Sequence, residues 1–171
     1  MIVNKITRNI LILILLASNI GCDQISKSIV RQQINPGEQI NLIDHFVILT
    51  RVENTGAFLS MGDSLPRLLY KFLMIVLPSI VLLYALYYLF TENNLSNLLT
   101  LGFCLIIGGG FGNIYDRILY NSVTDFLQFD FVIFHTGIVN IADISLTTGF
   151  FILMYEYLIN RRILKPKTSD K

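Results

Sequence analysis

Residues 71–90 read KFLMIVLPSIVLLYALYYLF, and this stretch decides the class of fold. After Lys71, no charged side chain interrupts it. A helix needs about 20 mostly apolar residues to cross a hydrocarbon core of roughly 30 Å. Pro78 is compatible with such a helix, because neighbouring helices can satisfy the carbonyl group that proline leaves without a donor. The stretch therefore predicts a transmembrane helix.

Working outward, three further windows have the same apolar character, with isolated polar residues. The chain is 53% hydrophobic and only 15% charged, whereas soluble domains are about 25% charged. We therefore expect one all-α membrane domain over residues 1–171. Its predicted spans are about Ile10–Ile29, Leu68–Phe90, Leu98–Arg117 and Gly137–Ile159.

Basic residues flank the outermost spans. Lys5 and Arg8 precede the first span, and five Lys or Arg residues follow the fourth within residues 160–171. The positive-inside rule therefore predicts that both termini lie in the cytoplasm, although the short link 91–97 lacks Lys and Arg. The longer connections, about 30–67 and 118–136, are then expected outside.

The two outer connections contain segments that favour β-structure. Gln39–Leu42 and Phe46–Val52 follow a turn signal at Asn35-Pro36-Gly37. In the second connection, aromatic and branched residues predict a short strand with an apolar face towards the lipid. Those residues are Phe126, Phe129, Phe131, Ile133 and Phe134. A small outer sheet that lies on the membrane surface is expected.

Several function classes are excluded by composition. The net charge of +1, with no basic run interleaved with aromatics, argues against nucleic-acid binding. Cys22 and Cys104 lie in apolar stretches without ligand spacing, so both are interpreted as buried small hydrophobes. His45 and His135 stand alone. We expect neither a metal site nor a cofactor.

The N-terminus offers a competing interpretation. Ile20-Gly21-Cys22-Asp23 follows a basic start and an apolar run, which resembles a lipoprotein signal peptide and would make the chain a substrate. Asn19 stands where such signals usually have leucine, and three more spans follow. The enzyme interpretation is therefore favoured over the substrate interpretation.

Polar residues within membrane spans are costly, so each is a candidate for a functional site. Counting about 1.5 Å per helical residue places one such set towards the outer face. It consists of Asp23, Asn113, Asp116, Arg117, Asp125, Asn140 and Asp143. Helix capping by Asn140 and Asp143, or an ion pair of Asp116 with Arg117, is the structural alternative. A transporter is the alternative function, although no internal repeat is visible.

Four glycines, Gly108, Gly109, Gly110 and Gly112, follow an apolar run. No strand precedes them and no Gly-Lys-Ser/Thr completes a phosphate-binding loop. Small residues let membrane helices approach closely. We interpret the cluster as a helix-packing surface.

Five motifs in order resemble those of the lipoprotein signal peptidases, also called signal peptidase II. They are Asp23-Gln24-Ile25-Ser26-Lys27, Asn54-Thr55-Gly56-Ala57-Phe58, Gly108-Gly109-x-x-Gly112-Asn113-x-x-Asp116-Arg117, Val123-Thr124-Asp125-Phe126 and Asn140-Ile141-Ala142-Asp143. Ala57 is not followed by the second alanine that many members have, and Val139 stands where many have an aromatic residue. Neither difference affects a candidate catalytic group.

The resemblance implies an aspartic endopeptidase of the bacterial cytoplasmic membrane that cleaves lipidated prolipoproteins just before the diacylglyceryl-modified cysteine. It implies catalytic roles for Asp125 and Asp143, an active site near the outer face, and inhibition by globomycin-type peptides. Supporting or substrate-binding roles are implied for Asp23, Lys27, Asn54, Gly56, Asn113, Asp116, Arg117, Asn140 and Ala142. Membrane lipid is the expected environment, and a monomer is the expected state.

The chemistry of two close carboxylates fits this activity. They cannot both ionise easily, so one holds a proton while the other acts as a base towards water. Such a pair titrates as a unit, and the sequence does not assign the acid and the base. Asp116 is the competitor for the second aspartate because it also lies at the outer end of its span.

Overall fold

The computed structural model describes residues 4–43, 46–56, 66–131 and 134–164, and within them four helical segments are long and apolar enough to cross a membrane. The four predicted spans are therefore confirmed, each within a few residues at most of its ends. The helices are α1 (Lys5–Gln33), the continuous run α2 (Arg67–Lys71), η2 (Phe72–Val76) and α3 (Leu77–Thr91), α4 (Asn97–Tyr120), and α5 (Ile141–Leu164). That residues 1–171 form one domain stays a prediction.

Two helix boundaries differ from expectation for identifiable reasons. Helix α5 begins at Ile141 and not near Gly137, because the backbone of Val139 pairs with Leu127 of the neighbouring strand. At Pro78, the π-helical turn η2 directly precedes the proline, and the Leu77 N–H donates to the Phe72 carbonyl. This wider turn accommodates a ring that would clash with the preceding turn of a regular α-helix.

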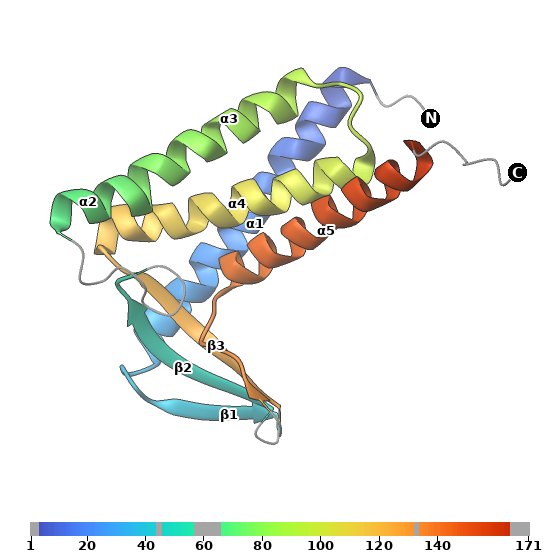
Figure 1. Cartoon of the computed structure of the whole chain (residues 1–171). Coiled ribbons are helices and arrows are strands. Elements are labelled where there is room, and N and C mark those ends of the chain that lie inside the picture. The colour runs from blue at the N-terminus through green and yellow to red at the C-terminus, as the bar shows by residue number, and fades with distance from the viewer. Residues whose placement is uncertain (1–3, 44–45, 57–65, 132–133, 165–171) are drawn as a thin grey trace, which may run out of the picture.

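Helix α4 is the centre of the bundle, with α3 and α5 on either side of it and α1 crossing behind (Figure 1). Its glycines permit this arrangement. A Cβ atom on Gly109 would lie 2.5 Å from the Ala142 carbonyl oxygen of α5. A Cβ atom on Gly112 would lie 2.6 Å from the Asp23 carboxylate of α1. The interpretation of the glycine cluster as a packing surface is confirmed.

A polar contact midway along α1 joins the same three helices. The Asn19 amide of α1 donates to the Leu105 carbonyl of α4 at 3.2 Å, and the Ser145 hydroxyl of α5 donates to the Asn19 side-chain oxygen at 2.9 Å. Gly108 leaves room for this side chain, since a Cβ atom there would lie 2.6 Å from the Asn19 amide nitrogen. Hydrogen bonds of this kind hold membrane helices together where no hydrophobic force does.

An antiparallel sheet lies beyond one end of the bundle, opposite the end that carries both termini (Figure 1). Its described strands, in the order β1-β2-β3-β4, are β1 (Gln39–Ile43), β2 (Val47–Asn54), β3 (Val123–Phe131) and β4 (Phe134–His135). The first two agree with the predicted segments. Strand β3 begins earlier than expected, so Asp125 lies within a paired strand and not in an irregular loop.

Two burial predictions were wrong. Cys22 is exposed on the surface of α1, and only Cys104 is buried. Phe126 was expected to face the lipid, but it is buried against Val30 and Ile34 at the end of α1. The reason is that β3 lies on this helix end, which the sequence pattern of one strand does not reveal. His45 lies outside the described residues.

Candidate active site

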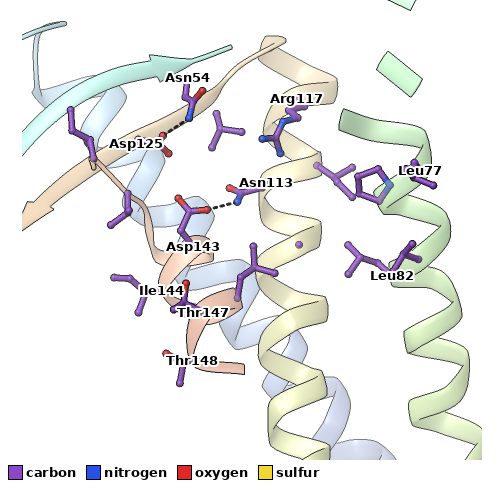
Figure 2. Close-up of a pocket in the computed structure, with 18 residues that line it drawn as sticks. Asn54, Leu77, Leu82, Asn113, Arg117, Asp125, Asp143, Ile144, Thr147 and Thr148 are labelled. Atoms are coloured by element: carbon purple, nitrogen blue, oxygen red, sulfur yellow. Dashed lines mark hydrogen bonds between the residues drawn. The ribbon is translucent and has the colours of Figure 1, made fainter. Parts of the chain in front are cut away.

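Asp125 and Asp143 face the same pocket from different elements, β3 and the first turn of α5 (Figure 2). The pocket has a volume of about 800 Å³. Three other predicted site residues also line it, namely Asn54, Asn113 and Arg117. Asp116, the competitor for the second catalytic aspartate, does not line this pocket.

The Asp125 carboxylate is buried, with 4% of the residue exposed. It accepts a hydrogen bond from the Asn54 amide at 3.0 Å and one from the Asn140 amide at 2.6 Å. Burial raises its pKa from 3.8 to about 6, the two amides oppose this rise, and the nearby charge of Asp143 adds to it. A proton is therefore retained at Asp125 to a higher pH than on an ordinary aspartate.

Strand pairing brings Asn54 to Asp125. In the β2–β3 register, Val52 lies opposite Asp125 and Asn54 lies opposite Val123, at the end of β2 nearest the helices. The side-chain oxygen of Asn54 accepts from the Gly56 backbone N–H at 3.0 Å. This contact fixes the orientation of the amide, so that its NH2 group faces the carboxylate of Asp125.

Asp143 belongs to a reciprocal cap at the start of α5. The Asn140 side-chain oxygen accepts from the Asp143 backbone N–H at 2.9 Å, and the Asn140 backbone N–H donates to Asp143 Oδ2 at 3.3 Å. This is the geometry of a capping box. Asp143 Oδ1 accepts from the Asn113 amide at 2.8 Å. Capping, the structural alternative, is thus present, and the same cap aims the carboxylate into the pocket.

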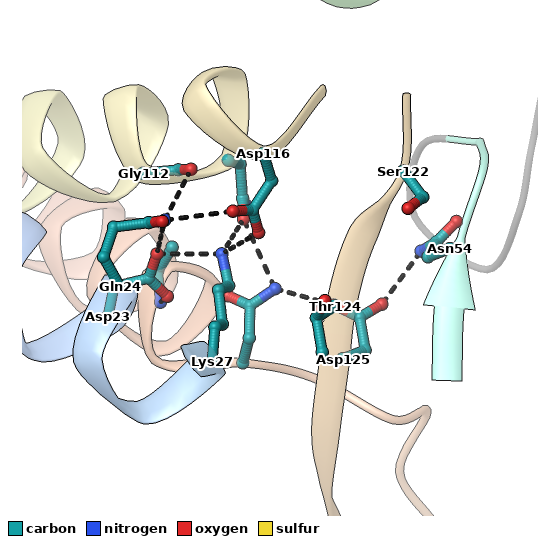
Figure 3. A network of polar contacts seen from close by, with 12 residues as sticks. Asp23, Gln24, Lys27, Asn54, Gly112, Asp116, Ser122, Thr124 and Asp125 are labelled. Carbon is teal, nitrogen blue, oxygen red and sulfur yellow. Dashed lines mark hydrogen bonds and ion pairs between the residues drawn. The ribbon is translucent and has the colours of Figure 1, made fainter. Parts of the chain in front are cut away.

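A fully buried charge cluster lies behind the two aspartates (Figure 3). The Lys27 ammonium lies 2.8 Å from Asp23 Oδ2 and 2.9 Å from Asp116 Oδ2, and it donates to Asn113 Oδ1 at 3.0 Å. Asp23 also accepts from the Ala142 backbone N–H at 2.9 Å. The cluster therefore ties α1 and α4 to the first turn of α5.

The eleven predicted site residues thus form one connected set, although they come from α1, α4, α5 and two strands. The last two members meet at the mouth of the pocket, where the Arg117 guanidinium donates to the Gly56 carbonyl at 3.1 Å. Within the described residues, Arg117 Nε has no hydrogen-bond partner.

Sequence reasoning missed Arg31, which pairs with Asp116 at 2.9 Å, donates to the Thr124 hydroxyl at 2.7 Å and lies over the Tyr120 ring. A signal was present, because Arg31 follows Lys27 by four residues, as Lys27 follows Asp23. Residues spaced by four share one face of a helix. The face therefore presents one carboxylate and two cations to α4.

The remaining wall of the pocket is mostly apolar, apart from Thr147 and Thr148 of α5, and comes mainly from the membrane helices. Helix α3 contributes Leu77, Pro78, Val81 and Leu82, which lie across the pocket from the polar groups, and α5 contributes Ile144 and Leu146 (Figure 2). The pocket thus has a polar end at the sheet and an apolar groove within the bundle. Among the described residues, no group of three or more His, Cys, Asp or Glu side chains could hold a metal ion.

Known proteins share this chain's sequence and fold. The family model described as signal peptidase (SPase) II matches residues 13–159. The lipoprotein signal peptidase of Streptococcus pneumoniae is 38% identical over 139 residues, which are 81% of this chain and 86% of that relative. The one from Wigglesworthia glossinidia brevipalpis is 41% identical over 108 residues, or 63% and 68%. A solved bacterial membrane enzyme superposes with a TM-score of 0.80 at 24% identity, covering 93% of this chain and 94% of its own.

Proposed function

Because this chain belongs to the signal peptidase II family, we propose that Asp125 and Asp143 are the catalytic pair with which it cleaves its substrates. The chain is a multi-pass bacterial membrane protease of the aspartic type that removes signal peptides from prolipoproteins. The observation that carries the assignment is geometric. These two carboxylates face one pocket, whereas Asp23 and Asp116 are held by cations behind it.

The surroundings of the two carboxylates differ in a way that divides the work. Asp143 accepts two N–H groups at the N-terminus of α5, where the helix dipole favours a negative charge. Asp125 is buried on a strand, and its pKa is raised to about 6. Asp125 therefore carries the proton in the active form of the pair, because it keeps that proton up to a pH of about 6, and Asp143 acts as the base.

The reaction follows from this division. The Asp143 carboxylate removes a proton from a water molecule, whose oxygen attacks the scissile carbonyl carbon. Asp125 donates its proton to the carbonyl oxygen, which becomes a hydroxyl of the tetrahedral intermediate. As the C–N bond breaks, the proton held by Asp143 passes to the leaving amine, and the hydroxyl proton returns to Asp125. The pair ends in its starting state, so no net proton is consumed.

The shape of the pocket suits a substrate that comes from the membrane. An apolar signal peptide and acyl chains fit the groove between α3 and α5, and the backbone to be cut lies at the polar end. Cleavage just before the lipidated cysteine follows if the lipid and the apolar peptide both stay in the hydrocarbon region. Arg117 lines the pocket, where its guanidinium is placed to bind a substrate carbonyl oxygen.

The orientation in the membrane is part of the same proposal. The basic residues near both termini favour a cytoplasmic location for that end of the bundle, and the opposite end, which carries the sheet and the two aspartates, then lies at the outer face. A monomer suffices, because one chain supplies every proposed site residue. A cyclic peptide inhibitor such as globomycin would occupy the apolar groove and approach the two aspartates.

The test is cleavage of a diacylglyceryl-modified prolipoprotein by purified variants in lipid nanodiscs. Asp125→Asn and Asp143→Asn are expected to fold and to lose at least about a thousandfold in kcat, because neither leaves a complete acid and base pair. Asp130→Asn, the same change on β3 outside the pocket, is the control and should keep wild-type activity. Near-normal cleavage by either pocket variant would refute the assignment.

A further inference from the structure

We propose that Lys27 is a positioning residue, which fixes the orientation of the Asn113 amide and through it the Asp143 carboxylate. The inference rests on the proposed role of Asp143. Lys27 lies outside the pocket and does not line it. The hydrogen bonds that link it to Asp143 pass through the side chain of Asn113, and its charge separately lowers the pKa of Asp125.

Three oxygen atoms lie around the Lys27 ammonium group. An ammonium group has three N–H donors. Lys27 donates to Asp23 at 2.8 Å and to Asn113 at 3.0 Å, and Asp116 Oδ2 lies 2.9 Å from the same nitrogen as an ion pair. The side chain is fully buried, so water does not compete for these donors. The nitrogen is therefore held in one place relative to α4.

The Asn113 amide could present either its oxygen or its NH2 group to a given neighbour. Its oxygen accepts from Lys27 and also faces the Asn140 amide nitrogen at 3.3 Å. A rotation of the amide by half a turn would place its NH2 group against two donors. The NH2 group must therefore point the other way, towards Asp143 Oδ1 at 2.8 Å.

The Asn140 amide, which donates to Asp125, also has a defined orientation. The Asn140 oxygen is occupied by the Asp143 backbone N–H, so its NH2 group faces Asn113 and Asp125. Lys27 donates to the oxygen of Asn113, and this leaves the NH2 group of Asn113 to donate to Asp143. Asp143 thus receives an N–H group oriented by Lys27 from behind the pocket, whereas the Asn140 amide that donates to Asp125 is oriented by the cap of α5.

A purely structural role makes a different prediction. A buried ion cluster can stabilise the packing of α1 on α4 without affecting the chemistry, and removing one cation then lowers stability only. Gln24 provides a matched comparison. Its amide donates to Asp23 at 3.0 Å and to Asp116 at 3.2 Å, the same two carboxylates that Lys27 contacts. No contact joins it to Asn113 within the described residues.

The experiment is a double-mutant cycle with Lys27→Met, Asn113→Ala and both together, assayed on a lipidated peptide in nanodiscs. Lys27→Met is expected to lower kcat at least tenfold with less than a twofold change in KM. It should also move the acid limb of the pH–activity profile to higher pH by about one unit, since the ionised pair loses a reliably oriented donor. In the Asn113→Ala background, the same change should cost less than about threefold in kcat.

Gln24→Leu should lower thermal stability without moving the acid limb. Equal losses from Lys27→Met in both backgrounds, or an unmoved acid limb, would overturn the proposal. If Lys27→Met does not fold, the double variant Lys27→Met/Asp23→Asn takes its place, because it removes one of the carboxylates that Lys27→Met leaves unpaired. The activity and the acid limb of this double variant are then compared with those of Asp23→Asn alone. Failure here is distinct from failure of the catalytic assignment, which would appear as activity in Asp143→Asn.

Discussion

Replacing Asp125 by asparagine should make the protein inactive and, at neutral pH, more stable. Burial raises the pKa of Asp125 from 3.8 to about 6. One pKa unit corresponds to about 1.4 kcal/mol, so keeping this group ionised in the fold costs about 3 kcal/mol above pH 7. Asparagine carries no charge and removes that cost.

The gain should be smaller than the full 3 kcal/mol. Both oxygens of Asp125 accept from amide groups, of Asn54 and Asn140, whereas an asparagine presents one NH2 group to a donor. A mismatched buried hydrogen bond costs about 1 kcal/mol or more. The expected net stabilisation is therefore about 1–2 kcal/mol, or roughly 2–8 °C in the melting temperature of a chain of this size.

The pH dependence has a definite sign. The folded protein binds the Asp125 proton more tightly than the unfolded chain does, so the wild-type stability falls as the pH rises from about 4 to about 6. The asparagine variant has no such dependence at this position. Its advantage should be present at pH 7.5 and absent near pH 4.

Thermal unfolding in one detergent, followed by intrinsic tyrosine fluorescence at pH 4.5, 6 and 7.5, provides the measurement. Asp130→Asn, the same change on β3 outside the pocket, serves as the control, and the advantage of Asp125→Asn is measured relative to it at each pH. A variant that is less stable than wild type at pH 7.5, or equally stabilised at all three values, would show that burial of Asp125 does not carry the stated cost.

Two further predictions concern the helices. Gly112→Ala should destabilise the fold by about 1–3 kcal/mol, because its Cβ atom would lie 2.6 Å from the Asp23 carboxylate. The control is Gly21→Ala, whose Cβ atom would have nothing within 4 Å and which should be neutral or slightly stabilising. Thermal unfolding of the two variants provides the comparison. Val81 lines the pocket, so Val81→Trp should raise KM more than it lowers kcat. Leu83 is exposed and does not line the pocket, so Leu83→Trp should change neither constant. Steady-state cleavage of a lipidated peptide measures both.

The site combines groups that stabilise the fold with groups that do not. The cap of α5 by Asn140 and Asp143 lowers the energy of the helix N-terminus, while the burial of Asp125 raises the energy of the folded state at neutral pH. Retaining the second feature is understandable only if the chemistry requires it. This contrast agrees with a catalytic role for Asp125.

Much of the architecture could be read from the sequence because the bilayer imposes simple rules. Residues 71–90 are apolar over a length that only a membrane helix satisfies, and three further windows obey the same rule. Helical rise alone predicted that Asp23, Asn113 and Asp143 lie towards one membrane face. The five ordered motifs then indicated the family, which the comparisons confirm.

The contacts between elements were decided only by the tertiary structure. Cys22 was misplaced and Arg31 was missed because the side of α1 that faces α4 depends on how the two helices cross. Asp125 meets Asn54 through the register of β2 on β3, and Lys27 meets Asn113 through glycine-mediated packing. Local spacing in the sequence was enough to predict how far along its helix each polar residue lies. Which donors face which carboxylates depended on distances between segments far apart in the chain, and those exist only in the folded protein.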